Sequence, residues 1–178
     1  MKKIQLFLFS IALIISSSLM AQEPAPTSYD FSFPDSNGKQ INITASEAGL
    51  DFKEAKGKVI LLNFFGKKCP PCLMEIPHLI EIQDDYKKDF EIIALQVQKP
   101  MSPEELNAFI KEKKLNYQVA DHPDMQDFTG FIMSAAQWKG MIPFMILFDQ
   151  KGVVRQMYSG MVAQSQIRSD IDAILAKK

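Results

Sequence analysis

The chain has 178 residues, of which 47% are apolar and 23% are charged, and its net charge is −1. This length fits one domain better than two, and the composition is that of an ordinary globular protein once the first segment is set aside. A nucleic-acid-binding protein needs a basic stripe that neutralises phosphates. The nearly balanced charge therefore excludes that class, and no nucleic-acid partner is expected.

The first 21 residues have the layout of a secretory signal peptide. A short basic start is followed by an apolar stretch from Ile4 to Ile15 and by small residues that end at Ala21. We expect cleavage after Ala21, export to the periplasm, and a linker over residues 22–28. The apolar stretch is shorter than the ~20 residues of a membrane-spanning helix. Because Leu19 is not the small residue that cleavage prefers, an N-terminal membrane anchor facing the periplasm stays open as the alternative.

The only two cysteines are Cys69 and Cys72, and two residues separate them. A disulfide between them closes a very small loop, so it constrains the unfolded chain little. An exported protein that relies on disulfides for stability usually joins distant cysteines. We therefore interpret the pair as a chemical site.

The pattern of residues 29–178 predicts one α/β domain with an N-terminal β-hairpin. Apolar residues flank a turn signal at residues 35–38, and the polar stretch 49–57 is expected to be a surface loop. Buried strands then alternate with helices, which predicts a central mixed sheet with helices on both faces. The expected strands are 59–65, 90–97, 117–120, 144–148 and 153–158. The expected helices are 69–82, 103–114, 125–138 (interrupted at Gly130) and 163–176.

The position of the cysteine pair predicts a redox site. A buried strand leads into a helix whose first turn carries Cys69 and Cys72, and residues three apart on a helix face the same way. The unpaired N–H groups and the dipole of the helix stabilise a thiolate on Cys69 and lower its pKa, and Lys67 and Lys68 add to this effect. We expect Cys69 to be the nucleophile and Cys72 to resolve the mixed disulfide.

A metal site is the main alternative for such a pair. Zinc needs about four ligands, and the other candidates are His78, on the same helix, and His122, distant in the sequence. The ten methionines suggest copper, but no M-x-x-M run or neighbouring His organises them. We expect no metal site, and we expect the methionines to fill the core and to form an adaptable hydrophobic contact surface.

The segment 62–77 resembles the active-site stretch of the TlpA/ResA-like thioredoxins, which are exported disulfide reductases. Their pattern is W-C-x-P-C-x-x-E-x-P, and the matching residues here are Cys69, Pro71, Cys72, Glu75 and Pro77. The stretch 142–152 resembles the cis-proline strand and hairpin of the family. The resemblance covers nearly all of residues 29–178 and implies the thioredoxin fold, extended at its N-terminus by the β-hairpin.

The resemblance also implies a substrate-binding edge beside the sulfurs. It implies that the Ile142–Pro143 bond is cis, with a free backbone edge next to the disulfide; a trans proline that opens a strand is the alternative. Ile142 and Pro143, together with Pro70 and Pro71, are therefore expected to contact the substrate.

Two positions bear on proton transfer and one on partner choice. Glu75 lies three residues beyond Cys72, and if burial raises its pKa, it can carry protons for the resolving thiol; an exposed glutamate is the alternative. Cytoplasmic thioredoxins carry a buried Asp six residues before the first cysteine, where this chain has Asn63, which has no proton to give. The family's Trp before the first cysteine, which shapes the contact surface beside the sulfur, is Lys68 here, so we expect a different choice of partner.

The function implied by the resemblance is that of a thiol–disulfide oxidoreductase that reduces protein disulfides, with apocytochrome c as one candidate substrate. It implies protein dithiol or disulfide partners, a membrane electron donor of the DsbD/CcdA type and a monomer. It requires no cofactor besides the redox-active disulfide Cys69–Cys72. An oxidase or isomerase of the same fold stays open, because direction depends on the reduction potential. A peroxidase would need a T-x-x-C site, and Gly66 occupies the Thr position in this chain. A copper protein of thioredoxin fold usually has three residues between its cysteines, whereas two residues separate Cys69 from Cys72.

Overall fold

The computed structural model describes residues 28–121 and 123–177. The expected signal peptide, residues 1–21, and its cleavage after Ala21 lie outside the described residues. Ser28, which we expected to end the linker, is the first residue of a strand. Within the described ranges, every helix is too short or too polar to cross a lipid bilayer.

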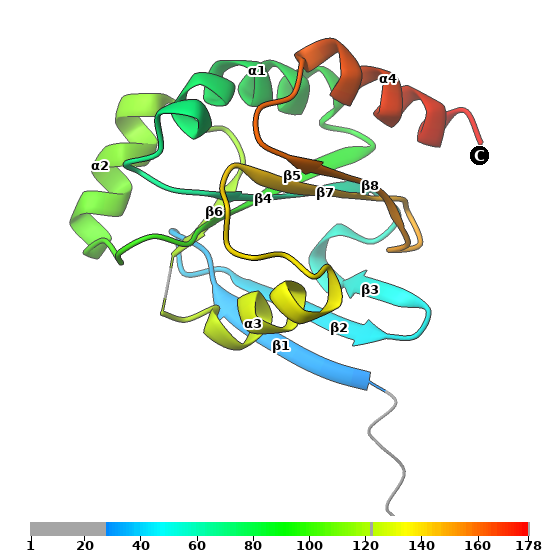
Figure 1. Ribbon diagram of the computed structural model, residues 1–178, viewed down its shortest axis with the longest axis horizontal. Helices are drawn as coiled ribbons and strands as arrows, with labels where there is room; N and C mark the ends of the chain where they lie inside the picture. Colours follow the sequence, from blue (N-terminus) through cyan, green and yellow to red (C-terminus); the bar gives the residue numbers. More distant parts are fainter. Residues whose placement is uncertain (1–27, 122, 178) are drawn as a thin grey trace, which may run out of the picture.

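A five-stranded sheet lies at the centre of the domain (Figure 1). Its strands are β4 (Val59–Phe65), β5 (Phe90–Gln96), β6 (Gln118–Asp121), β7 (Phe144–Phe148) and β8 (Val154–Ser159). Their order across the sheet is β6-β5-β4-β7-β8. β4, β5 and β6 run parallel, whereas β7 is antiparallel to β4 and to β8, so the predicted mixed sheet is confirmed. Every residue of β4 is buried, because this strand has neighbours on both sides and other elements on both faces.

Helices cover both faces of this sheet, as predicted. They are α1 (Pro70–Tyr86), α2 (Pro103–Lys113), α3 (Gln126–Ala135) and α4 (Gln164–Leu175). Figure 1 shows α1 and α4 above the sheet and α3 below it. The expected interruption at Gly130 is wrong, because α3 runs through it. One glycine costs a helix only about 1 kcal/mol, and Phe128 and Ile132 anchor α3 in the core.

The expected N-terminal hairpin is confirmed, and a third strand extends it into a second sheet. It contains β1 (Ser28–Pro34), β2 (Gln40–Ser46) and β3 (Gly49–Phe52), all antiparallel. The prediction of a surface loop over 49–57 is therefore wrong at its start. Leu50 and Phe52 alternate toward the core and are 6% and 5% exposed, which makes this short segment a strand. A 3-10 helix, η1 (Lys53–Ala55), follows it.

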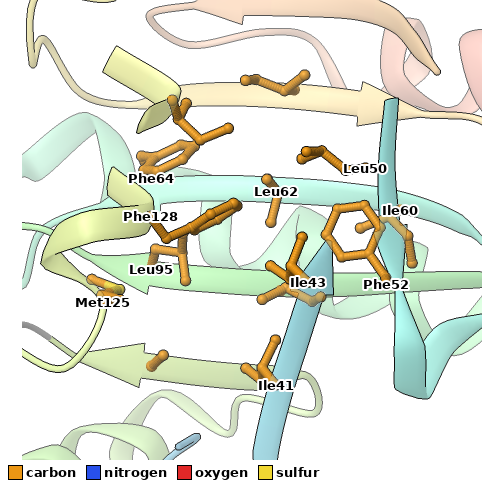
Figure 2. Packing of buried hydrophobic residues seen from close by; sticks show 14 of the residues in the cluster. Ile41, Ile43, Leu50, Phe52, Ile60, Leu62, Phe64, Leu95, Met125 and Phe128 are labelled. Atoms are coloured by element: carbon orange, nitrogen blue, oxygen red, sulfur yellow. The ribbon is translucent and has the colours of Figure 1, made fainter. Parts of the chain in front are cut away.

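The small sheet and α3 form one core with the lower face of the central sheet. Phe128 of α3 packs against Phe31 and Phe33 of β1, with ring centroids 5.2 and 5.6 Å apart. Figure 2 shows Phe128, Phe52 and Leu62 of β4 in this buried cluster. The N-terminal sheet is therefore an integral layer of the domain, and the upper face is left to α1 and α4.

Candidate active site

Cys69 and Cys72 form a disulfide at the start of α1. β4 ends at Phe65, so the chain leaves the centre of the sheet and enters this helix after a short loop. Cys69 is the N-cap of α1, and its Sγ accepts a 3.3 Å hydrogen bond from the N–H of Cys72. Pro70 follows at the first helical position, where a missing N–H costs nothing. A thiolate that forms at Cys69 on reduction therefore lies where the free N–H groups and the positive dipole end of the helix stabilise it.

Both sulfur-bearing residues are recessed. Cys69 is 6% exposed and Cys72 is 3% exposed, whereas Pro70 beside them is exposed and Pro71 is half-buried. They share a cluster with Phe65 of β4 and with residues of α2 and β5. The expectation that Cys69 is nearer to solvent is met by only a small margin, so a partner must reach into the surface to exchange with it.

The loop before Cys69 is fixed by Gln98. The N–H of Lys68 donates to Gln98 Oε1 over 2.9 Å. Gly66 passes so close that a Cβ there would overlap the Gln98 side chain. Lys67 Nζ lies 3.5 Å from Glu105 Oε2 of α2, whereas the side chain of Lys68 is exposed. This arrangement holds the approach to the disulfide and places an exposed cation at its entrance.

The Ile142–Pro143 bond is cis, as predicted. Pro143 is buried directly before β7, and Ile142 packs against the cluster that contains the two cysteines. Two hydrogen bonds hold this segment: Trp138 Nε1–H donates to Met141 O over 2.7 Å, and the N–H of Gly160 donates to Pro143 O over 2.9 Å. The structure therefore places Ile142 against the cluster that contains the disulfide, with Pro143 directly after it, while Pro70 and Pro71 lie between the two cysteines.

Glu75 is buried beside the same site. Its side chain is on α1 one turn beyond Cys72, the residue is 4% exposed, and its Oε1 accepts a 3.0 Å hydrogen bond from the N–H of Val162. Burial raises the pKa of Glu75 above its ordinary value, and the bond from Val162 lowers it in part. Burial and, secondarily, the charge of Glu75 raise the pKa of Tyr117, which also packs against the cysteine cluster. The expected buried carboxyl is confirmed, while its role in proton transfer stays a prediction.

Asn63 lies on the face of β4 that α1 covers. Every second residue of a strand points to the same face, so Asn63 shares its face with Leu61 and Phe65. These two residues pack in the buried clusters that include side chains of α1. Asn63 is 4% exposed, and within the described ranges its Oδ1 has no hydrogen-bond partner. This buried position carries no titratable group, which leaves Glu75 as the buried carboxyl next to the disulfide.

Three residues that shape the site were not identified from the sequence: Gln98, Trp138 and Val162. Gln98 is held through Gln96, which is fully buried and whose Oε1 accepts the N–H of Gln98 over 2.7 Å. A glutamine at the buried end of a strand, Gln96, is the signal that could have pointed to Gln98. The contact of Val162 joins residues 87 apart in the chain, so no local pattern announces it.

Two observations bear on the metal site and on the peroxidase that were considered as alternatives. Among the residues that the structure describes, no group of three or more His, Cys, Asp or Glu side chains could hold a metal ion. His78 is exposed, and His122 lies outside the described residues. A T-x-x-C peroxidase site would need a Thr at position 66. The Gln98 side chain lies so close to Gly66 that a Thr side chain would fit only if Gln98 moved.

Comparisons with known proteins agree with this site. A model of the AhpC/TSA family matches residues 22–157. The thiol-disulfide oxidoreductase ResA of Bacillus thuringiensis subsp. konkukian is 32% identical over 128 residues, which cover 70% of this chain and 68% of that protein. ResA of Bacillus subtilis is 27% identical over 146 residues, which cover 82% and 72%. A thiol-disulfide isomerase from Corynebacterium glutamicum has the same fold, with a TM-score of 0.64, 23% identity, and coverage of 88% of this chain and 100% of that one. The chain thus belongs to the AhpC/TSA family and is a thiol–disulfide oxidoreductase of thioredoxin fold, similar to the ResA proteins.

Proposed function

We propose that this oxidoreductase works as a reductase of disulfides in exported proteins, with Cys69 as the attacking thiolate. The observation that supports this most directly is the position of Cys69 as the N-cap of α1, where its Sγ accepts the N–H of Cys72. A group held there is stabilised as an anion, and the thiolate is the form of cysteine that attacks a disulfide.

The reaction takes two exchanges. The Cys69 thiolate attacks one sulfur of the partner's disulfide, so a Cys69–partner bond forms while the partner's other sulfur leaves as a thiolate and takes up a proton. Cys72 then loses its proton and attacks the Cys69 sulfur, which forms the Cys69–Cys72 disulfide and releases the second partner thiolate. Two electrons pass from the protein to the partner, and the oxidised state is the one described above.

Glu75 is the group that we assign to the proton of Cys72. It lies one helical turn beyond Cys72, it is buried, and burial raises its pKa, which makes it a better proton acceptor than an exposed glutamate. Asn63, the other buried polar side chain beneath α1, cannot take this part because it has no titratable proton.

The partner's chain is assigned to the edge formed by Ile142 and Pro143 with Pro70 and Pro71. The cis bond and the hydrogen bonds at Met141 and Pro143 fix this edge, and Ile142 packs against the cysteine cluster. A preformed edge lets a partner bind without first ordering the site, which favours association.

The setting of the reaction follows from the first residues and from the resemblance to the TlpA/ResA-like proteins. Residues 1–21 support export to the periplasm, either as a cleaved protein or with an N-terminal anchor. A membrane donor of the DsbD/CcdA type would return electrons to the disulfide, and the protein would act as a monomer without a further cofactor. Apocytochrome c is the substrate that we would test first.

Trapping of the mixed disulfide tests the roles of the two cysteines. Reduced Cys72→Ser, incubated with insulin, should accumulate one insulin chain on Cys69, because the resolving thiol is missing. Cys69→Ser is the matched control and should form no comparable adduct. Mass spectrometry of the bands on a non-reducing gel identifies the linkage. Adduct formation on Cys72 in Cys69→Ser that equals or exceeds the adduct on Cys69 in Cys72→Ser would contradict the assignment.

A further inference from the structure

Three exposed methionines belong to three separate segments beside the disulfide. Met74 follows Cys72 by two residues in α1 and is 62% exposed. Met141, 69% exposed, directly precedes Ile142, and Met161, 54% exposed, lies in the loop between β8 and α4. Single exposed apolar residues are common on proteins, so what requires explanation is the way in which these three are brought together.

Hydrogen bonds tie the three segments to one another. The N–H of Gly160, just before Met161, donates to Pro143 O over 2.9 Å. The N–H of Val162, just after Met161, donates to Glu75 Oε1 over 3.0 Å, next to Met74. Met161 is therefore anchored on one side to the cis-proline segment and on the other side to α1. Figure 1 shows the loops at the start of β7 and the end of β8 at the same end of the sheet as the start of α1.

The backbone that presents Met141 is held by a hydrogen bond from a packed tryptophan. Trp138 is 7% exposed and stacks on Phe144 with ring centroids 5.1 Å apart and an interplanar angle of 9°. Its Nε1–H holds Met141 O, so the carbonyl is fixed while the side chain points outward into solvent. Flexible thioether side chains on a fixed backbone can fit apolar groups of many shapes. We call Met74, Met141 and Met161 the methionine surface.

The other side of the disulfide carries positive charge. A hollow of about 630 Å³ lies beside the loop that leads to Cys69, and its lining includes Lys67, Lys68, Gln98, Lys99 and Glu105. Glu105 is paired with Lys67, whereas Lys68 and Lys99 are exposed. A partner that covers both sides of the disulfide thus meets apolar side chains on one side and cations on the other.

We infer that the methionine surface and the lysine-lined hollow together dock an unfolded polypeptide whose cysteine has large apolar side chains on one side and acidic side chains on the other. The recessed sulfurs favour an extended, unfolded chain, which can enter the surface around Cys69 more closely than a folded domain can. The cations favour acidic partner residues near Lys68, and the methionines accept apolar residues of varied shape. The inference rests on the proposed reductase function and names the chemistry of its substrates.

Two disulfide-linked peptide probes test this surface. In both, a central cysteine forms a mixed disulfide with glutathione; one probe has Leu and Phe on one side and Asp on the other, and the second has Ser at all these positions. In a single turnover, the reduced wild type should have a second-order rate constant for the apolar–acidic probe about tenfold above that for the Ser probe, equivalent to about 1.4 kcal/mol. In the triple variant Met74→Ser, Met141→Ser, Met161→Ser, this ratio should fall to near one.

A matched triple variant controls for the loss of exposed apolar area. Val153→Ser, Val154→Ser, Met157→Ser removes side chains that are 37%, 45% and 49% exposed at and before β8, and it should keep the wild-type ratio. Lys68→Ser should lower the rate on the apolar–acidic probe by a larger factor than the rate on the Ser probe, so that the ratio between the two falls, most clearly at low salt.

The outcomes separate the inference from the function on which it rests. A wild type that reduces neither probe nor oxidised glutathione contradicts the reductase function itself. The wild type could instead reduce both probes and oxidised glutathione. If the ratio of the rates on the two probes is then the same in the wild type and in the methionine triple variant, the docking surface alone is overturned. If the triple variant converts a dimer into a monomer in light scattering and keeps the ratio, the surface is a contact between copies of this chain and the inference is also overturned.

Discussion

Replacement of Glu75 by glutamine isolates the effect of ionising one buried carboxyl. Glutamine keeps the shape of the side chain and an oxygen that can accept the N–H of Val162, which lies 3.0 Å from Glu75 Oε1. The variant therefore removes the ionisation and leaves the packing in place. Burial raises the pKa of Glu75 in the folded protein above the ordinary value that it has in the unfolded chain.

The direction of the pH effect follows from this shift. A carboxyl whose pKa is higher in the folded state favours folding while it is protonated, so its contribution is complete below the unfolded pKa. That contribution is lost as the pH rises through the folded pKa of Glu75. Each unit by which burial raises the pKa corresponds to about 1.4 kcal/mol of stability lost at high pH. Glutamine does not ionise, so Glu75→Gln should gain stability relative to the wild type as the pH rises.

Urea unfolding of the oxidised proteins between about pH 4 and about pH 8 measures this difference. The matched control is Glu81→Gln, an exposed glutamate of the same helix that accepts a hydrogen bond from Gln164. The difference between Glu75→Gln and the wild type should grow with pH, and the difference for Glu81→Gln should stay small and flat. Parallel curves for Glu75→Gln and the wild type would refute the argument from burial.

The same variant tests the proposed proton transfer in the reduced protein. If Glu75 takes the proton of Cys72, the pH profile of Cys72 alkylation should differ between Glu75→Gln and the wild type, measured in a Cys69→Ser background. Identical profiles would leave Glu75 as a buried structural residue without a part in the exchange.

Three further substitutions probe the scaffold of the site. Gly66→Ala should lower the free energy of unfolding by about 1–3 kcal/mol, since the new Cβ overlaps the Gln98 side chain, and an unchanged urea midpoint would contradict this contact. Phe128→Ala should cost about 3–5 kcal/mol because the ring is 1% exposed, and a cost below about 1 kcal/mol would show that α3 does not hold the N-terminal sheet on the core. Trp138→Phe should keep the aromatic packing but lose the hydrogen bond to Met141 O, costing about 0.5–1.5 kcal/mol and slowing formation of the mixed disulfide; an unchanged rate would argue against a role for this bond.

The parts of the fold that could be predicted from the sequence are those with a strong local signal. Residues 144–148 form a continuous apolar run, and β7 occupies this segment as predicted. The spacing of Cys69 and Cys72 after a buried strand predicted a reactive pair at a helix start, and the structure places Cys69 at the N-cap. The cis Ile142–Pro143 bond was expected from the family resemblance alone, because few X–Pro bonds are cis.

The parts that could not be predicted depend on contacts between distant segments. β3 has only Leu50 and Phe52 facing the core, too few for an alternation to be recognised, and it is a strand because it pairs with β2. The hydrogen bond from Val162 to Glu75 exists only once α4 and α1 lie side by side. The crowding of Gln98 over Gly66 likewise depends on how two separate loops meet.

The reduction potential of the Cys69–Cys72 couple tests the proposed direction of the reaction most directly. The oxidised protein would be equilibrated against defined ratios of reduced and oxidised dithiothreitol or glutathione, with alkylation of the free thiols as the readout. The proposal of a reductase predicts a value at or below that of thioredoxin, about −270 mV. A value near about −120 mV would mean that the reduced form is the stabilised one, and the protein would then be an oxidase.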